Sequence, residues 1–184
     1  MNKQSRSEFS LALLLVVIGI GSRLVFNELK IYNFNAVSAA AMFGGAYMLR
    51  SRWSYIIPIA TMLATDAALG FYHFPSMLIN YSALVLCMVI GRGYAKKPSM
   101  LRYIGVVLGG SVSFFLITNA GAWMFQTLEP VLYPMTFAGL MQSYAYAIPF
   151  FQNSFISNML FSAVLFGGFE MAKVFLPKER LAVA

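Results

Sequence analysis

Long apolar runs alternate with short polar or charged segments along the whole chain. A helix needs about 20 mostly apolar residues to cross a hydrocarbon core of about 30 Å. The pattern therefore predicts an all-α, polytopic membrane helical bundle in which residues 1–184 form a single transmembrane domain. Six membrane-spanning helices are expected, at about residues 9–27, 36–49, 53–71, 76–91, 103–125 and 154–176.

The first apolar run follows a basic start, at Lys3 and Arg6, which is also typical of signal peptides. The run continues to about Phe26, and no A-x-A-like cleavage site ends it. We therefore interpret it as a retained membrane span.

The segment at residues 134–151 is apolar enough to suggest a seventh span. It is short for the hydrocarbon core and has prolines near its two ends, at Pro134 and Pro149. We predict instead a helical or re-entrant segment on the outer side, which covers the bundle as a lid. Non-helical backbone at membrane depth is tolerated only where protein or a water-filled cavity shields it.

The distribution of lysine and arginine predicts the orientation, because cytoplasmic loops carry an excess of both. With six spans, Arg23 and Lys30 fall on one side of the membrane and the other eleven of the thirteen cations fall on the opposite side. Both termini are therefore expected in the cytoplasm. The cations on the inner side are Lys3, Arg6, Arg50, Arg52, Arg92, Lys96, Lys97, Arg102, Lys173, Lys178 and Arg180.

Composition agrees with a membrane protein and excludes several functions. Charged residues make up 10% of the chain, against roughly 25% in soluble domains, so apolar surface must face lipid. The net charge of +7 follows the predicted inner loops, so no nucleic-acid partner is expected. One cysteine and one histidine leave no basis for a disulfide, a metal site or a cofactor. We find no catalytic motif and predict that the protein is not an enzyme.

Arg23 and Asp66 are ionisable residues within apolar spans, and both fall toward the outer end. Such residues are expensive in a membrane and usually mark a functional site. We predict that they pair or share a polar cavity. The alternative is that each side chain reaches separately to the outer interface.

Further polar and aromatic residues gather at the same depth, whereas the inner halves of the spans contain far fewer of them. This clustering predicts an outward-opening ligand pocket, with residues 33–35, 72–74 and 134–151 as lids. An interfacial aromatic belt with helix caps is the alternative. The predicted substrate-binding residues are Arg23, Asn35, Asp66, Asn80, Asn119, Trp123 and Asn158.

Small residues recur at four-residue spacing in two predicted spans, which allows helix backbones to approach closely. The stripes serve either internal helix packing or docking to a partner membrane protein. They consist of Ala36, Ala40 and Gly44, and of Gly105, Gly109 and Ser113.

Four stretches of the chain together resemble a family of uncharacterised small bacterial membrane proteins, and this resemblance implies a place in the bacterial inner membrane. They are Asn33–Tyr47, Asp66–Gly70, Leu116–Asn119 and Ala147–Phe151. The wider outline is similar to the S components of energy-coupling-factor vitamin transporters. That resemblance implies six helices, both termini inside and an outward-facing pocket for a vitamin or a metal.

The sequence departs from S components at two points. Their first span commonly carries an Ala-x-x-x-Ala stripe that docks the energising module, whereas the corresponding region here begins Ala12-Leu13-Leu14. Some solitary relatives bind cobalamin through a cysteine, but Cys87 falls on the inner side. Docking to a shared energising module is thus put in doubt, and a solitary mode of action stays open.

Two functional hypotheses follow. The first is a membrane-embedded substrate-binding protein for uptake of a small, vitamin-like molecule, with the bilayer, the ligand and an energising membrane module as partners. The second is a non-transporting scaffold or assembly protein of the envelope. A cavity lined by the outer polar residues favours the first, and a solidly packed outer half favours the second.

Overall fold

The computed structural model describes residues 3–48, 51, 53–95, 97–126 and 131–175. Regular structure in these residues is entirely α-helical, as predicted. The predicted inner cations Arg50, Arg52, Lys96, Lys178 and Arg180 lie outside the described residues. The helices are α1 (Lys3–Glu28), α2 (Val37–Tyr47), α3 (Trp53–Leu69), α4 (Phe74–Ala95), α5 (Met100–Met124) and α6 (Phe137–Phe175).

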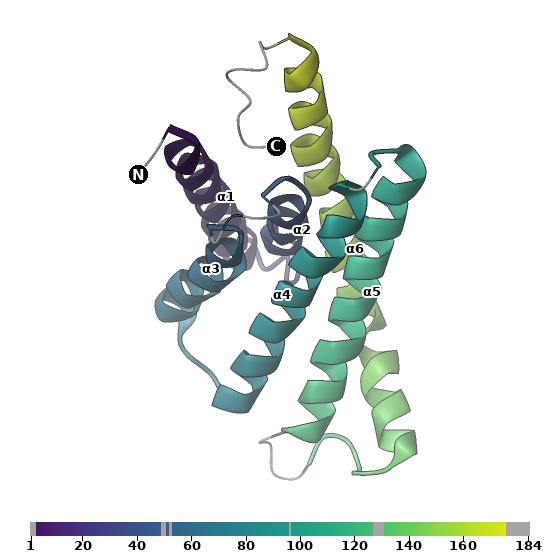
Figure 1. Ribbon diagram of the computed structural model, residues 1–184. Coiled ribbons are helices and arrows are strands. Elements are labelled where there is room, and N and C mark those ends of the chain that lie inside the picture. The colour runs from purple at the N-terminus through teal and green to yellow at the C-terminus, as the bar shows by residue number, and fades with distance from the viewer. Residues whose placement is uncertain (1–2, 49–50, 52, 96, 127–130, 176–184) are drawn as a thin grey trace.

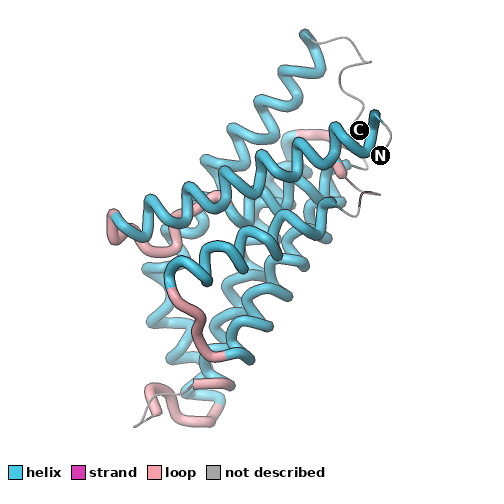
Figure 2. Tube along the Cα trace, turned by 90° about the vertical axis from the view of Figure 1, so that its left-hand side faces the viewer, coloured by secondary structure: helices cyan, strands magenta, loops and turns pink. Residues whose placement is uncertain are grey.

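The helices form an elongated bundle (Figure 1). The first turn of α1 and the last turn of α6 lie at one end of the bundle, and the α3–α4 and α5–α6 connections lie at the other end (Figures 1 and 2). Among the described residues, α1, α4, α5 and α6 are long and apolar enough to cross a membrane. Four such helices indicate a membrane-associated protein.

Helix α2 occupies the centre of the bundle. All 11 of its residues are buried, and it packs against each of the other five helices. At 1.5 Å per residue it extends about 16 Å, roughly half of a hydrocarbon core of about 30 Å. The sequence predicts a span at residues 36–49, and the observed helix begins one residue later and ends at Tyr47, with irregular backbone at residues 29–36 before it.

Helix α6 joins two elements that the sequence analysis treats as separate. The segment at residues 134–151 is helical from Phe137 onward, and it continues without interruption into the predicted last span. Its 39 residues extend about 58 Å, far more than one membrane crossing requires. Pro149 lies inside the helix instead of ending it. A continuous helix loses few backbone hydrogen bonds at a proline, whereas a break in an apolar environment would expose many more.

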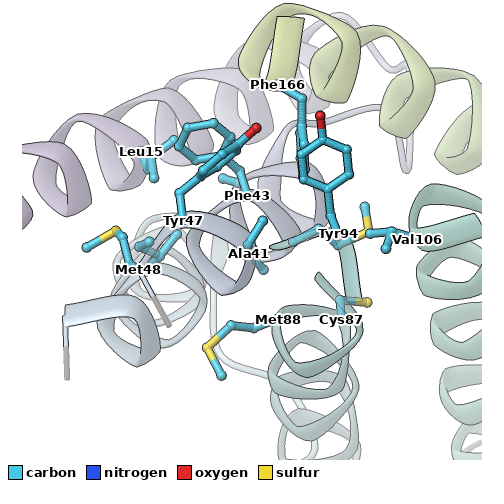
Figure 3. Close-up of a cluster of buried hydrophobic side chains, with 14 of the residues drawn as sticks. Leu15, Ala41, Phe43, Tyr47, Met48, Cys87, Met88, Tyr94, Val106 and Phe166 are labelled. Atoms are coloured by element: carbon cyan, nitrogen blue, oxygen red, sulfur yellow. The ribbon is translucent and has the colours of Figure 1, made fainter. Parts of the chain in front are cut away.

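The apolar core fills the half of the bundle near the chain ends. It gathers side chains of the other five helices around α2, and its members include Leu15, Phe43, Met88 and Phe166 (Figure 3). The aromatic rings of Phe43 and Phe166 meet edge to face, with centroids 5.4 Å apart. This packing anchors α2 at its C-terminal end.

Glycines set the closest helix contact. A Cβ atom on Gly45 of α2 would collide with the backbone carbonyl of Met88 in α4, and one on Gly91 of α4 would collide with that of Met42 in α2. Each glycine therefore allows one helix backbone to lie against the other.

The two small-residue stripes lie in different environments. Ala36, Ala40 and Gly44 are buried within α2 and its N-cap, so this stripe serves internal packing and is not a docking surface. On α5, by contrast, no atom would lie within 4 Å of a Cβ on Gly105. That part of the second stripe faces outward.

Candidate functional site

A cavity of about 360 Å³ occupies the half of the bundle opposite the chain ends. All six helices contribute to its wall. Helices α1 and α3 supply one position each, Arg23 and Met62, and the loops that follow them supply Asn33, Asn35 and Tyr72. The polar lining side chains are Arg23, Asn33, Asn35, Ser38, Tyr72, Ser76, Asn80, Ser111, Thr118, Asn119, Ser154, Ser157 and Asn158.

Five of the seven predicted substrate-binding residues line this cavity, from α1, the α1–α2 loop, α4, α5 and α6. They are Arg23, Asn35, Asn80, Asn119 and Asn158. The predicted residues that do not line it are Asp66 and Trp123.

Asp66 lies behind the wall and holds Arg23 in place. Its Oδ1 atom is 2.7 Å from Nη1 of Arg23, which confirms the predicted pairing of the two charges. The Asp66 side chain is 1% exposed, and that of Arg23 is 21% exposed. The same Nη1 atom also donates to the hydroxyl of Thr65 and contacts the sulfur of Met62 at 3.3 Å.

The second carboxylate oxygen of Asp66 is also satisfied. Oδ2 accepts a hydrogen bond of 2.8 Å from the Tyr81 hydroxyl, so the carboxylate links α1, α3 and α4. A buried charge is stable only when it is paired and hydrogen-bonded. These contacts therefore fix the position of the guanidinium at the cavity wall.

Amide side chains form much of the polar lining, and several are held by their Nδ2 atoms. Asn158, which is 3% exposed, donates to Oγ of Ser111 at 3.0 Å. Asn119 donates to the Phe115 carbonyl at 2.8 Å, and Asn80 donates to the Tyr72 hydroxyl at 2.7 Å. Within the described chain, no donor reaches the Oδ1 atoms of these three amides.

Tyr72 closes part of the cavity from the α3–α4 connection. Partial burial raises the pKa of its phenol above the usual value, so the hydroxyl stays protonated at neutral pH. A neutral phenol can accept the bond from Asn80 and still donate one of its own. Of the predicted lid residues 72–74, Tyr72 lines the cavity, and His73 and Phe74 do not.

The loop before α2 forms another part of the wall. Lys30 and Asn33 adopt left-handed backbone conformations, with φ of 60° and 61°. Asn35 accepts a bond of 3.1 Å from the Val37 amide through Oδ1, and Ser22 accepts one of 3.0 Å from the Ala36 amide. These bonds satisfy backbone donors at the start of α2, which keeps the loop in place beside the cavity.

Trp123 has a different contact from the one predicted. Its indole Nε1 donates to the Pro134 carbonyl at 2.9 Å and so braces the α5–α6 connection. The neighbouring residue Ala122 lines the cavity. Successive helix residues point about 100° apart, so this one-residue difference turns the indole away from the cavity.

Aromatic lining residues are the main feature that the sequence analysis missed. Phe114 and Phe115 of α5 line the cavity beside Phe150 and Phe151 of α6. The rings of Phe115 and Phe151 lie with their centroids 4.8 Å apart. Both phenylalanines of α5 lie three or four residues from Ser111 and from Thr118. Residues at this spacing share a helix face, so the polar positions give a signal for them in the sequence.

The lining suits non-covalent binding of a small molecule. The cavity volume falls within the range of about 300–1,000 Å³ that is typical of ligand pockets. The described residues that line the wall include no cysteine, histidine or carboxylate. In the described ranges, no group of three or more His, Cys, Asp or Glu residues could hold a metal ion.

Comparison with known proteins places the chain in a family. No curated protein and no solved structure matches it significantly. The sequence of residues 3–179 matches the family of unknown function DUF6580. This match covers nearly the whole chain, and the protein therefore belongs to the DUF6580 family.

Proposed function

We propose that the protein is a membrane-embedded binding protein for uptake of a small molecule. The observation that carries this proposal is the polar cavity beside the Arg23–Asp66 pair. A bundle that serves packing alone gains nothing from the nearly buried amide of Asn158 beside an open space, because burying polar groups costs free energy.

The proposal includes six membrane crossings with both termini in the cytoplasm. The excess of lysine and arginine near the chain ends supports this orientation. The cavity would then open toward the outer half of the membrane. The irregular backbone at residues 29–36 fits such a depth, because it lines the cavity and would be shielded from lipid.

The uptake step requires movement of the ligand past the apolar core around α2. We therefore include either a large reorientation or an energising membrane module as a partner. The outward-facing part of the α5 stripe, at Gly105, offers room for a closely packed helix of such a partner.

The scaffold hypothesis remains the second candidate, and the same Gly105 surface is the observation that favours it. The two functions differ in their dependence on the cavity. A scaffold needs the outer surface of α5 and not the cavity. Variants that block the cavity or that surface therefore distinguish the two functions.

Mass spectrometry of small molecules that co-purify with the detergent-solubilised protein tests the proposal. Ser157, which is 1% exposed, lines the cavity, and a Ser157→Phe variant would fill part of it. Leu160→Phe is the matched control, because Leu160 lies one turn further along α6 and is 55% exposed. We expect the bound molecule in the wild type and in Leu160→Phe, and its loss from Ser157→Phe.

Equal small-molecule content in all three proteins, with each of them monodisperse by size-exclusion chromatography, would contradict the binding function. A Gly105→Leu variant that keeps the bound molecule but no longer supports uptake in cells would indicate a partner surface on α5. Asn119→Leu serves as a second cavity variant, since it replaces the amide with an apolar side chain that branches at the same carbon and has the same number of heavy atoms.

A further inference from the structure

We propose that the cavity selects an uncharged, ring-containing molecule that carries both hydrogen-bond donors and acceptors. This inference rests on the proposed binding function and specifies its ligand class. It follows from the charge balance, the free polar atoms, the aromatic rings and the volume of the cavity.

The charge balance of the wall is the first argument. Among the described residues that line the cavity, only Arg23 has a permanent charge, and Asp66 compensates it at 2.7 Å. An anionic ligand would have to compete with a carboxylate that is already buried and bonded. A cationic ligand would find no carboxylate among the described lining residues. Because moving an ion out of water is costly without a partner, the cavity disfavours both.

The free polar atoms indicate what the ligand must carry. All polar contacts of Arg23 within the described chain come from Nη1, so Nη2 and Nε remain available as donors. Asn35 uses Oδ1 for the Val37 amide, which leaves its Nδ2 atom as a further donor. These donors belong to α1 and the loop after it.

Acceptors come from other helices. The Nδ2 atoms of Asn80, Asn119 and Asn158 are engaged, and their Oδ1 atoms have no partner among the described residues. These amides belong to α4, α5 and α6. A ligand that spans the cavity would thus accept bonds at one edge and donate bonds at another, as a carboxamide or a lactam does.

The aromatic rings favour a planar ring system. Phe114, Phe115, Phe150 and Phe151 line the same cavity, and the adjacent rings of Phe115 and Phe151 are tilted by 50°. Aromatic side chains contribute contact area and favour offset-stacked or edge-to-face ring pairs. A polar ligand without an aromatic ring, such as a sugar, could not form these aromatic ring pairs.

The volume limits the size of the ligand. At about 30 Å³ per water molecule, a cavity of about 360 Å³ corresponds to about twelve waters. A molecule with one ring or two fused rings and short polar substituents has a size that fits this volume.

The test is affinity selection from a defined equimolar mixture, followed by mass spectrometry. The mixture holds matched triplets on pyridine and quinoline rings: the carboxamide, the carboxylate and the N-methylated cation of the carboxamide. Wild-type protein and Ser157→Phe are compared in the same detergent. We expect carboxamides to be enriched over their carboxylates and cations by about tenfold, because the charged forms lose hydration without gaining a free counter-ion.

An Asp66→Asn variant tests the reason for the selection. It leaves the Arg23 charge uncompensated at the wall, so the preference should move toward carboxylates by about tenfold. The double variant Arg23→Gln/Asp66→Asn removes both charges and should again prefer carboxamides. This double variant keeps the test decisive if Asp66→Asn alone is poorly folded.

Equal or stronger enrichment of carboxylates or cations by the wild type would overturn the ligand class and leave the binding function standing. No enrichment of any triplet over Ser157→Phe would likewise overturn it. The binding function is judged independently by the co-purification comparison of Ser157→Phe with Leu160→Phe. Failure of the ligand class and failure of the binding function are therefore distinguishable.

Discussion

Replacing Asp66 with asparagine removes a carboxylate that forms an ion pair with Arg23 and accepts a hydrogen bond from Tyr81. The consequences for stability follow from this geometry. At 2.7 Å and an effective dielectric constant of about 20, the attraction between Arg23 and Asp66 is about 6 kcal/mol before desolvation. Removing one partner of a buried ion pair typically costs about 3–5 kcal/mol, because the other charge remains buried. Arg23 is 21% exposed at the cavity, so the lower figure applies.

We therefore expect Asp66→Asn to destabilise the protein by about 3 kcal/mol. At about 2–4 °C per kcal/mol for a chain of this size, the midpoint of thermal unfolding should fall by about 6–12 °C. The assay is thermal unfolding of detergent-solubilised protein, followed by intrinsic tryptophan fluorescence. Tyr81→Phe is the matched control, since it removes one hydrogen bond to Asp66 and keeps the ion pair.

The double variant Arg23→Gln/Asp66→Asn decides whether the ion pair is the cause. Removing both charges leaves no uncompensated ion, so the double variant should be more stable than Asp66→Asn alone. A coupling energy of about 2 kcal/mol between the two positions is expected from the double-mutant cycle. The reasoning would be refuted if Asp66→Asn shifted the midpoint by less than about 1 °C, or if the two substitutions were additive.

Three further outcomes follow from the packing. Gly45→Val should destabilise the protein by about 3 kcal/mol in the same unfolding assay, because its side chain would collide with the backbone of α4; the control Gly21→Val meets no neighbouring atom, and an equal effect of both would contradict the packing argument. Trp123→Phe should lower the free energy of unfolding by about 1 kcal/mol through the lost hydrogen bond to Pro134, and it should leave the amount of bound ligand in mass spectrometry unchanged. A smaller amount of bound ligand would show that the indole contributes to the binding site. Ser162→Ala should be neutral or stabilising, since the buried hydroxyl has no partner in the described structure; a clear loss of stability would reveal an unseen bond.

Much of the candidate site was predictable because ionisable and amide side chains are conspicuous in an apolar sequence. Arg23 and Asp66 were expected to pair, since each alone would be expensive within a membrane. Asn80, Asn119 and Asn158 stood out for the same reason, at matching depth in their helices. Depth along a helix follows from residue number, because each residue advances the helix by 1.5 Å.

The direction in which each side chain points around its helix was not predictable from the sequence. Rotation about a helix axis is normally read from a contrast between apolar and polar faces, and membrane helices with lipid outside and apolar packing inside lack that contrast. Trp123 was therefore assigned to the cavity, although its neighbour Ala122 occupies that position. The phenylalanines of α5 were missed because an aromatic residue fits lipid, core and cavity equally well.

By itself, the sequence determined the helical class, the approximate extent of α1, α3, α4 and α5, and the set of polar residues at one depth. These properties depend on hydrophobicity summed over many neighbouring residues, and such sums tolerate local uncertainty. The tertiary structure decided that α2 is short and central, that residues 137–175 form one helix, and that Asp66 stands behind Arg23. Those features depend on contacts between residues distant in the chain, which no local pattern records. The cavity is the product of these contacts, since its walls come together from six helices whose apolar surfaces give no preferred rotation on their own.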